Sequence, residues 1–163
     1  LLPLFAAAYP ERMPVDLLQL DFLFRLPTQQ FIRQRSAGNQ CTYSYLFNQD
    51  LPINGGSVPW HCADVPYVFH NTEMVPSIQE EGVTKLEAQI FDSVIAFART
   101  GDPNHVGIPH WPVSAPGEER TMVFCKNTQV RCNHDAELIP LLAKHMGPMF
   151  ERMMRKNMGD VQH

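Results

Sequence analysis

The segment from Thr84 to Thr100 carries the pattern that most constrains how this 163-residue chain folds. Thr84 and Glu87 match a capping box, in which Thr84 accepts from the backbone three residues on and Glu87 reaches back. Gly101 suits the position just after a helix, and Pro103 forbids continuation. The apolar residues form one broad stripe at helical spacing, made of Leu86, Ile90, Phe91, Val94, Ile95, Phe97 and Ala98. The pattern predicts an amphipathic helix over 84–100 that buries one face.

Helices are also predicted before this segment. Apolar spacing favours a helix over 15–25, which Leu26-Pro27-Thr28 interrupts. A second helix follows over about 29–36 and ends near Gly38, with Pro27 and Thr28 suited to its first turn.

Two stretches are typical of strands. Cys41–Phe47 is rich in aromatic and β-forming residues and predicts a buried strand. Residues 121–125 and 129–132 predict a short hairpin with its turn at 126–128. Beyond them, Asp135 can cap a last helix that starts near Ala136 and breaks at Gly147-Pro148. Helices and strands in this order predict the α/β class.

The loop after strand 41–47 holds the residues with the clearest chemistry. His61 is followed three residues later by Asp64. An imidazole can take a serine proton and return it to a leaving group near neutral pH, but it needs a partner carboxylate and a hydroxyl. No Gly-x-Ser-x-Gly is present, and Ser44 and Ser57 are not flanked as a nucleophile elbow requires. By itself, His61 is more typical of a loop histidine than of a catalyst, and Ser57 of a loop hydroxyl.

Taken together, these segments resemble the C-terminal part of the type-B carboxylesterase and cholinesterase family. The resemblance rests above all on Phe97–Asn104, followed by Pro109–Pro112, and also on residues 21–27, 41–47 and 61–69. It implies the C-terminal portion of an α/β-hydrolase fold, with helices, a few strands including a hairpin, and a loop carrying the catalytic histidine. It also implies a serine esterase that acts on small esters and needs neither a cofactor nor a metal.

The resemblance assigns roles to two residues. His61 matches the triad histidine, and Asp64 matches an acidic position that orients the site. The family usually has glycine directly after the histidine; here Cys62 sets a soft nucleophile beside the site without removing the base. The nucleophile elbow, the oxyanion loop and the triad acid have their counterparts upstream of Leu1. Residues 1–163 are therefore interpreted as one C-terminal fragment that supplies His61 and is inactive alone.

Composition excludes several other classes. The formal charge is −4, from 13 Lys and Arg against 17 Asp and Glu, with no basic cluster for nucleic acid. No apolar run approaches membrane-spanning length. Leu1–Ala8 is interpreted as the cut end of an internal helix. Export therefore cannot be judged, and a cytoplasmic location is slightly favoured.

The four cysteines do not predict a disulfide scaffold in a chain of this length. Cys41 and Cys62 are expected to be buried, reduced thiols, and a bridge between Cys125 and Cys132 is not signalled. A metal site would need ligand spacings such as Cys-x-x-Cys or His-Glu-x-x-His, and neither is present.

Two alternatives stay open. The chain could derive from a non-catalytic recognition or adhesion module that keeps the fold and lacks the triad, although His61 with Asp64 favours an enzymatic parent. It could also be a truncation, a cleavage product or one piece of a split gene. We further expect self-association, because Tyr43, Tyr45, Leu46, Phe91, Ile95 and the face Met149–Met158 cannot all be covered within 163 residues.

Overall fold

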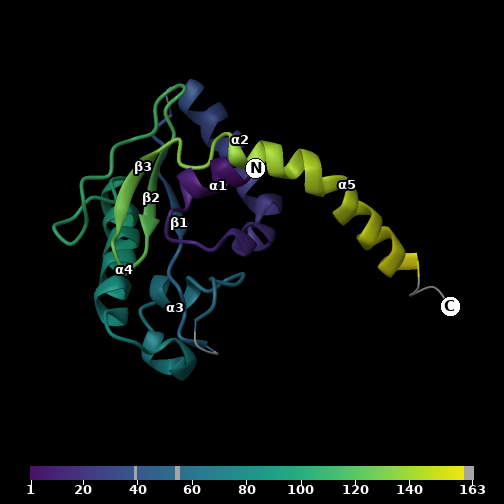
Figure 1. The fold of residues 1–163 in the computed structure, drawn as a ribbon. Helices are drawn as coiled ribbons and strands as arrows, with labels where there is room; N and C mark the ends of the chain where they lie inside the picture. Colours follow the sequence, from purple (N-terminus) through teal and green to yellow (C-terminus); the bar gives the residue numbers. More distant parts are fainter. Residues whose placement is uncertain (39, 54–55, 160–163) are drawn as a thin grey trace. The chain divides into compact units, whose positions relative to one another are not determined.

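The computed structural model describes residues 1–38, 40–53 and 56–159 (Figure 1), apart from the side chains of residues 153, 154 and 156–159. The chain divides into two compact units. Unit 1 comprises Leu1–Phe31 and the residues from His134 onward, and unit 2 comprises Ile32–Asn133. Unit 2 contains the sheet and the loop that carries His61.

The sheet of unit 2 consists of β1 (Ser44–Phe47), β2 (Arg120–Phe124) and β3 (Gln129–Cys132) in that order. β1 pairs in parallel with β2, and β2 pairs antiparallel with β3. A parallel pair needs a long crossover connection, and here the connection contains α4 (Val83–Thr100). The predicted hairpin and helix are confirmed. The predicted strand is also confirmed, but it begins only at Ser44 and is not buried throughout, because Tyr45 is exposed and Leu46 and Phe47 are half-buried.

The core of unit 2 lies between α4 and one face of the sheet (Figure 1). Met122 and Phe124 alternate along β2 and so point to the same face. Short helical segments, α3 (Val65–Val68), η3 (Thr72–Met74) and η4 (Pro76–Ile78), connect β1 to α4. The buried cluster consists of Leu51, Ala63, Tyr67, Ile78, Val83, Leu86, Ile90, Trp111, Met122 and Phe124.

The two ends of α4 differ in how well local sequence predicts them. Gly101 follows the helix with a φ of +78°, and its N–H donates to the Phe97 carbonyl at 2.8 Å, as expected. The predicted capping box is wrong. The helix begins one residue earlier, after Gly82 at a φ of +91°, with no side-chain cap. The Glu87 carboxylate is buried and accepts instead from the backbone N–H of Thr72 at 2.8 Å.

Unit 1 contains α1 (Leu2–Ala8), η1 (Pro14–Gln19), the first part of α2 (Phe22–Ala37) and α5 (Leu138–Gly159). Its central polar group is Asp135, which was predicted to cap the last helix and is 2% exposed. Both Asp135 carboxylate oxygens accept hydrogen bonds from other segments: the donors are Arg25 (2.8 Å), Gln29 (2.8 Å) and the hydroxyl of Tyr9 (3.1 Å). One buried carboxylate therefore links three segments of this unit.

Two of the prolines that were predicted to break helices, Pro27 and Pro148, lie inside them. In place of the helix predicted over 15–25, the chain forms η1 followed by α2, which runs through Pro27. Just before α2, the carboxylate of Asp21 accepts a hydrogen bond of 3.1 Å from the N–H of Phe24. α5 likewise continues through Pro148. A helical proline deprives the carbonyl four residues earlier of its donor. The two residues concerned, Leu23 and Lys144, are both exposed.

The cysteine predictions are only partly correct. The disulfide state of Cys125 and Cys132 was left open by the sequence, and Cys41 and Cys62 were predicted to be reduced and buried. All four cysteines are free. Cys41 and Cys62 are exposed, which contradicts the predicted burial. Cys41, which the strand prediction placed in the sheet, lies before the first residue of β1, and Cys62 lies in a turn.

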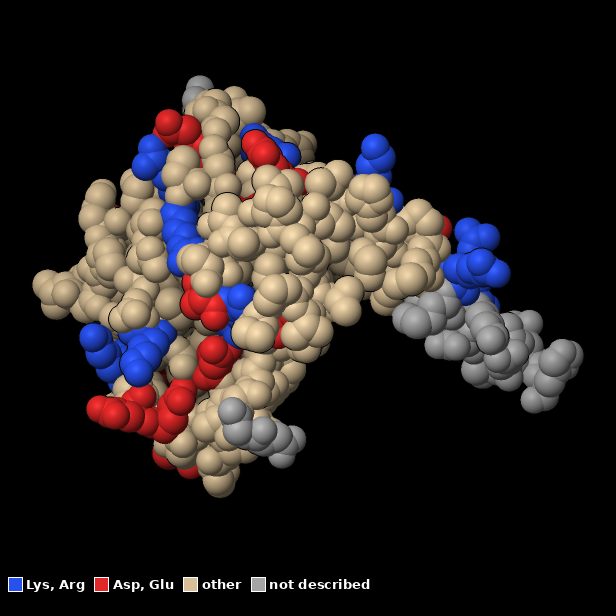
Figure 2. All heavy atoms as spheres, viewed as in Figure 1, with Lys and Arg blue, Asp and Glu red and all other residues tan. Residues whose placement is uncertain are grey.

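Charged residues of both signs lie on the face shown in Figure 2, and its basic side chains do not gather into one continuous patch. None of the helices among the described residues is long and apolar enough to cross a membrane.

Several apolar side chains remain uncovered. Tyr45 is 42% exposed and Met149 60% exposed. Tyr43, Leu46, Phe91 and Ile95 are partly buried. Met153, Met154 and Met158 lie outside the described side chains. Self-association through these surfaces stays a prediction.

Candidate active site

A short β-bridge and a turn anchored by one buried residue present His61 at the surface of unit 2. Leu51 and Ser57 exchange two backbone hydrogen bonds of 2.9 Å, and Leu51 is fully buried. The chain then turns at residues 61–64, where the N–H of Ala63 donates to the Trp60 carbonyl at 3.0 Å. Ala63 is buried, whereas His61 is exposed. The apolar side of this turn is thus anchored in the core, and the imidazole faces outward.

Asp64 is held by β1. Its carboxylate accepts a hydrogen bond of 2.8 Å from the hydroxyl of Tyr45. Burial, together with this hydrogen bond and the Asp64 charge, raises the pKa of the Tyr45 hydroxyl. The hydroxyl therefore stays protonated, and a donor, at neutral pH. The Asp64 carbonyl also accepts from the N–H groups of Tyr67 and Val68, both at 3.0 Å. Asp64 thus ties the turn to β1 and to α3.

Tyr45 is the site residue that sequence reasoning missed. It was noted only as an apolar strand residue. The alternation of β1 sets Tyr45 on the opposite face from Ser44, and only the fold reveals that its hydroxyl meets Asp64. A tyrosine in the strand that precedes the loop of the candidate base is the signal that could have indicated it.

The two serines near the loop are engaged locally. Ser57 Oγ donates to the Val58 carbonyl at 3.0 Å, as expected for a loop hydroxyl. Ser44 is buried, and its Oγ lies 3.1 Å from Thr121 Oγ1. Neither has the environment of an exposed nucleophile. Among the described residues, no cluster of three or more His, Cys, Asp or Glu side chains could hold a metal ion.

Cys62 adopts a backbone conformation that favours glycine. Its φ is +66°, in the left-handed region. For a residue with a Cβ this region costs about 1–2 kcal/mol. Cys62, beside the candidate base, is therefore strained. The family that the sequence resembles usually has glycine at this position, and glycine adopts this backbone conformation without strain.

We expect Cys62→Gly to raise the free energy of unfolding by about 1 kcal/mol, because relief of the strain exceeds the added freedom of the unfolded chain. Urea denaturation would measure the change. Cys41→Gly is the matched control: Cys41 is also exposed but is not in the left-handed region, and this change should not stabilise the protein. An unchanged or lower stability of Cys62→Gly would contradict the assignment of strain.

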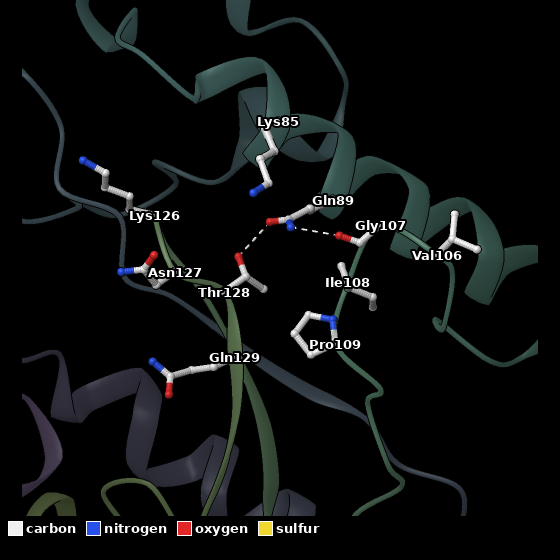
Figure 3. A pocket seen from close by; sticks show the side chains of 10 residues that line it. All are labelled: Lys85, Gln89, Val106, Gly107, Ile108, Pro109, Lys126, Asn127, Thr128 and Gln129. Carbon is white, nitrogen blue, oxygen red and sulfur yellow. Dashed lines mark hydrogen bonds between the residues drawn. The ribbon is translucent and has the colours of Figure 1, made fainter.

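A separate depression of about 540 Å³ lies in unit 2, between α4, residues 106–109 and the turn after β2 (Figure 3). Gln89 braces its walls, since its amide accepts from Thr128 Oγ1 at 2.8 Å and donates to the Gly107 carbonyl at 2.9 Å. Lys85 and Lys126 line it. None of the described lining residues belongs to the His61 loop, so this depression is not the candidate site.

Comparison with known proteins supports the α/β-hydrolase assignment. The model of the carboxylesterase family matches residues 11–138. An esterase from anaerobic Clostridium hathewayi, described as able to hydrolyse aliphatic aromatic polyesters, superposes with a TM-score of 0.83 at 49% identity, over 88% of this chain and 29% of that one. The carboxylesterase of Geobacillus stearothermophilus superposes with a TM-score of 0.53 at 23% identity, over 63% of this chain and 22% of that one, which shows the fold alone.

Curated relatives agree. Phenmedipham hydrolase of Pseudarthrobacter oxydans is 28% identical over 87 residues, which cover 49% of this chain and 18% of that protein. Liver carboxylesterase B-1 of Rattus norvegicus is 28% identical over 114 residues, which cover 67% and 20%. The chain belongs to the carboxylesterase family of α/β hydrolases. It spans about a fifth of the length of these two relatives.

Proposed function

We propose that residues 1–163 form the C-terminal part of a serine carboxylesterase and that His61 is its general base and acid. The observation that carries this proposal is the exposed imidazole of His61 on a turn that is anchored by Ala63 and braced through the Asp64–Tyr45 hydrogen bond of 2.8 Å. Family membership supports the same role.

In the proposed reaction, His61 removes the proton from a serine hydroxyl as its oxygen attacks the ester carbonyl. The imidazolium then returns the proton to the departing alcohol, which leaves an acyl-serine. His61 next takes a proton from water, whose oxygen attacks the acyl carbonyl, and protonates the serine as the carboxylic acid leaves. The serine, the oxyanion donors and the triad acid are supplied by residues outside 1–163. Asp64 acts as a positioning residue, because its carboxylate is bonded to Tyr45.

The 163-residue chain alone is expected to lack esterase activity, since oxyanion stabilisation and the nucleophile supply most of the rate. Hydrolysis of a p-nitrophenyl ester by this chain and by a longer protein that contains it would test the proposal. Only the longer protein should reach an ordinary kcat of about 1–10³ s⁻¹. Enzyme-like turnover by the short chain that disappears in His61→Ala would contradict the expected inactivity. A longer protein with no activity would favour the adhesion module.

A further inference from the structure

Glu87 is a buried carboxylate that the proposed reaction does not use. It lies on α4 and is 5% exposed. One oxygen, Oε1, accepts the N–H of Thr72 at 2.8 Å, and the other, Oε2, lies 3.5 Å from Nδ1 of His70. A carboxylate is removed from water only where donors replace the water. Thr72, which donates to Glu87, and His70, which lies beside it, both come from the segment that directly follows α3.

A second contact holds the side chain of His70 against α4. Its ring stacks on Phe91, with ring centroids 4.7 Å apart and planes 27° apart. Glu87 and Phe91 are four residues apart, so they lie on one face of α4. The φ of His70 is +54°, a left-handed value that non-glycine residues keep only where their surroundings hold them. The stacking and the Glu87 carboxylate provide such surroundings.

Tyr67 is the other titratable group that faces Glu87 from α3. Burial raises the pKa of the Tyr67 hydroxyl to about 12, and the negative charges of Glu80 and Glu87 add to the increase. The hydroxyl is therefore neutral at physiological pH. His70 is a basic side chain within ion-pair distance of Glu87, with Nδ1 3.5 Å from Oε2.

The segment held by Glu87 is continuous with the His61 turn. The N–H of Asn71 donates to the Pro66 carbonyl at 3.0 Å, and the N–H of Phe69 donates to the Val65 carbonyl at 3.1 Å. At the other end of α3, Asp64 is bonded to Tyr45 on β1. α3 is thus tied to α4 at one end and to the sheet at the other.

We propose that Glu87 and His70 form a clamp that positions the His61 loop by tying the end of α3 to α4. Both are positioning residues, since they act on His61 through α3. The proposal rests on the proposed function of His61 only for its catalytic consequence; the clamp itself concerns the order of α3.

Four variants separate the clamp from general stability. Glu87→Ala removes both contacts. Glu87→Gln keeps an oxygen that can accept from the N–H of Thr72. Its kcat and amide exchange should therefore stay much closer to those of the unchanged protein than in Glu87→Ala. His70→Asn removes the ring but keeps a residue that tolerates the left-handed region. Asp92→Ala is the control, because Asp92 is an exposed carboxylate on the same helix.

In the esterase that contains these residues, Glu87→Ala is expected to lower kcat by about 10- to 100-fold with KM within about twofold, because a displaced base costs rate and not substrate affinity. His70→Asn should act in the same direction, and Asp92→Ala should have no effect. In the 163-residue chain, amide hydrogen exchange of Val68, Phe69 and Thr72 should accelerate at least about tenfold in Glu87→Ala and His70→Asn.

Two results would overturn the clamp. One is amide exchange in Glu87→Ala and in His70→Asn that is no faster than in Asp92→Ala. The other is an unchanged kcat in Glu87→Ala while His61→Ala abolishes turnover, which leaves the proposed function intact. If His61→Ala retains activity, the proposed function fails instead, and the exchange rates alone decide the clamp.

Discussion

Replacement of His61 by Ala in the longer esterase should lower kcat by about 10⁴-fold or more, because members of a catalytic triad act as a unit. Without the imidazole, the serine loses its base and the alcohol loses its proton donor. Steady-state hydrolysis of a p-nitrophenyl ester would measure the loss. His110→Ala is a matched control, since His110 is also an exposed histidine of unit 2.

Variants that lose the Asp64–Tyr45 hydrogen bond should have a kcat between that of His61→Ala and that of the His110→Ala control. Asp64→Ala and Tyr45→Phe remove the 2.8 Å hydrogen bond that holds the turn, but they leave the base in place, so each should reduce kcat less than His61→Ala. A loss of less than about tenfold in His61→Ala would rule out its role as the triad histidine.

Removal of the Asp135 carboxylate should have the largest effect on stability. Asp135→Ala leaves the Arg25 guanidinium, which is 7% exposed, without its 2.8 Å ion pair. Breaking a buried pair by removing one partner costs about 3–5 kcal/mol. Urea denaturation monitored by the circular dichroism of the helices would measure the loss. Glu137→Ala, at an exposed position two residues further on, should change stability little, and an equal loss in both variants would contradict the account.

The same carboxylate should make stability depend on pH. Burial alone would raise the pKa of Asp135, but the hydrogen bond and the charge of Arg25, with help from His134 and Tyr9, lower it below its ordinary value. A carboxyl whose pKa is lower in the folded state stabilises the protein above its unfolded pKa of about 3.9. That stability is lost as the pH falls through the lower folded value. Asp135→Asn should flatten this dependence below about pH 4.

Local patterns predicted the elements that local interactions decide. Helix 84–100 was predicted from its apolar stripe and from Gly101, and both follow from sequence spacing alone. The capping box failed because Glu87 bonds to Thr72, a partner that only the tertiary fold brings near. Pro27 was wrongly predicted to interrupt a helix, since α2 runs from Phe22 to Ala37 through it.

The candidate site was predictable only in part. His61 and Asp64 were indicated by their resemblance to a family motif, and the structure sets both at the turn before α3. Tyr45, Glu87 and His70 were not predicted, since each acts through a contact between segments 15 or more residues apart in the chain. Such pairings depend on which face of a strand or helix meets the loop.

Labelling with a small alkyl fluorophosphonate tests the central claim most directly. An activated serine attacks phosphorus and expels fluoride, and the attack requires the histidine base. In the longer protein, mass spectrometry of digested peptides should find the label on one serine outside residues 1–163. The rate of labelling should fall by about 10³-fold or more in His61→Ala. Label on Ser44 or Ser57, or an undiminished rate in His61→Ala, would contradict the assignment of His61 as the base of a serine esterase.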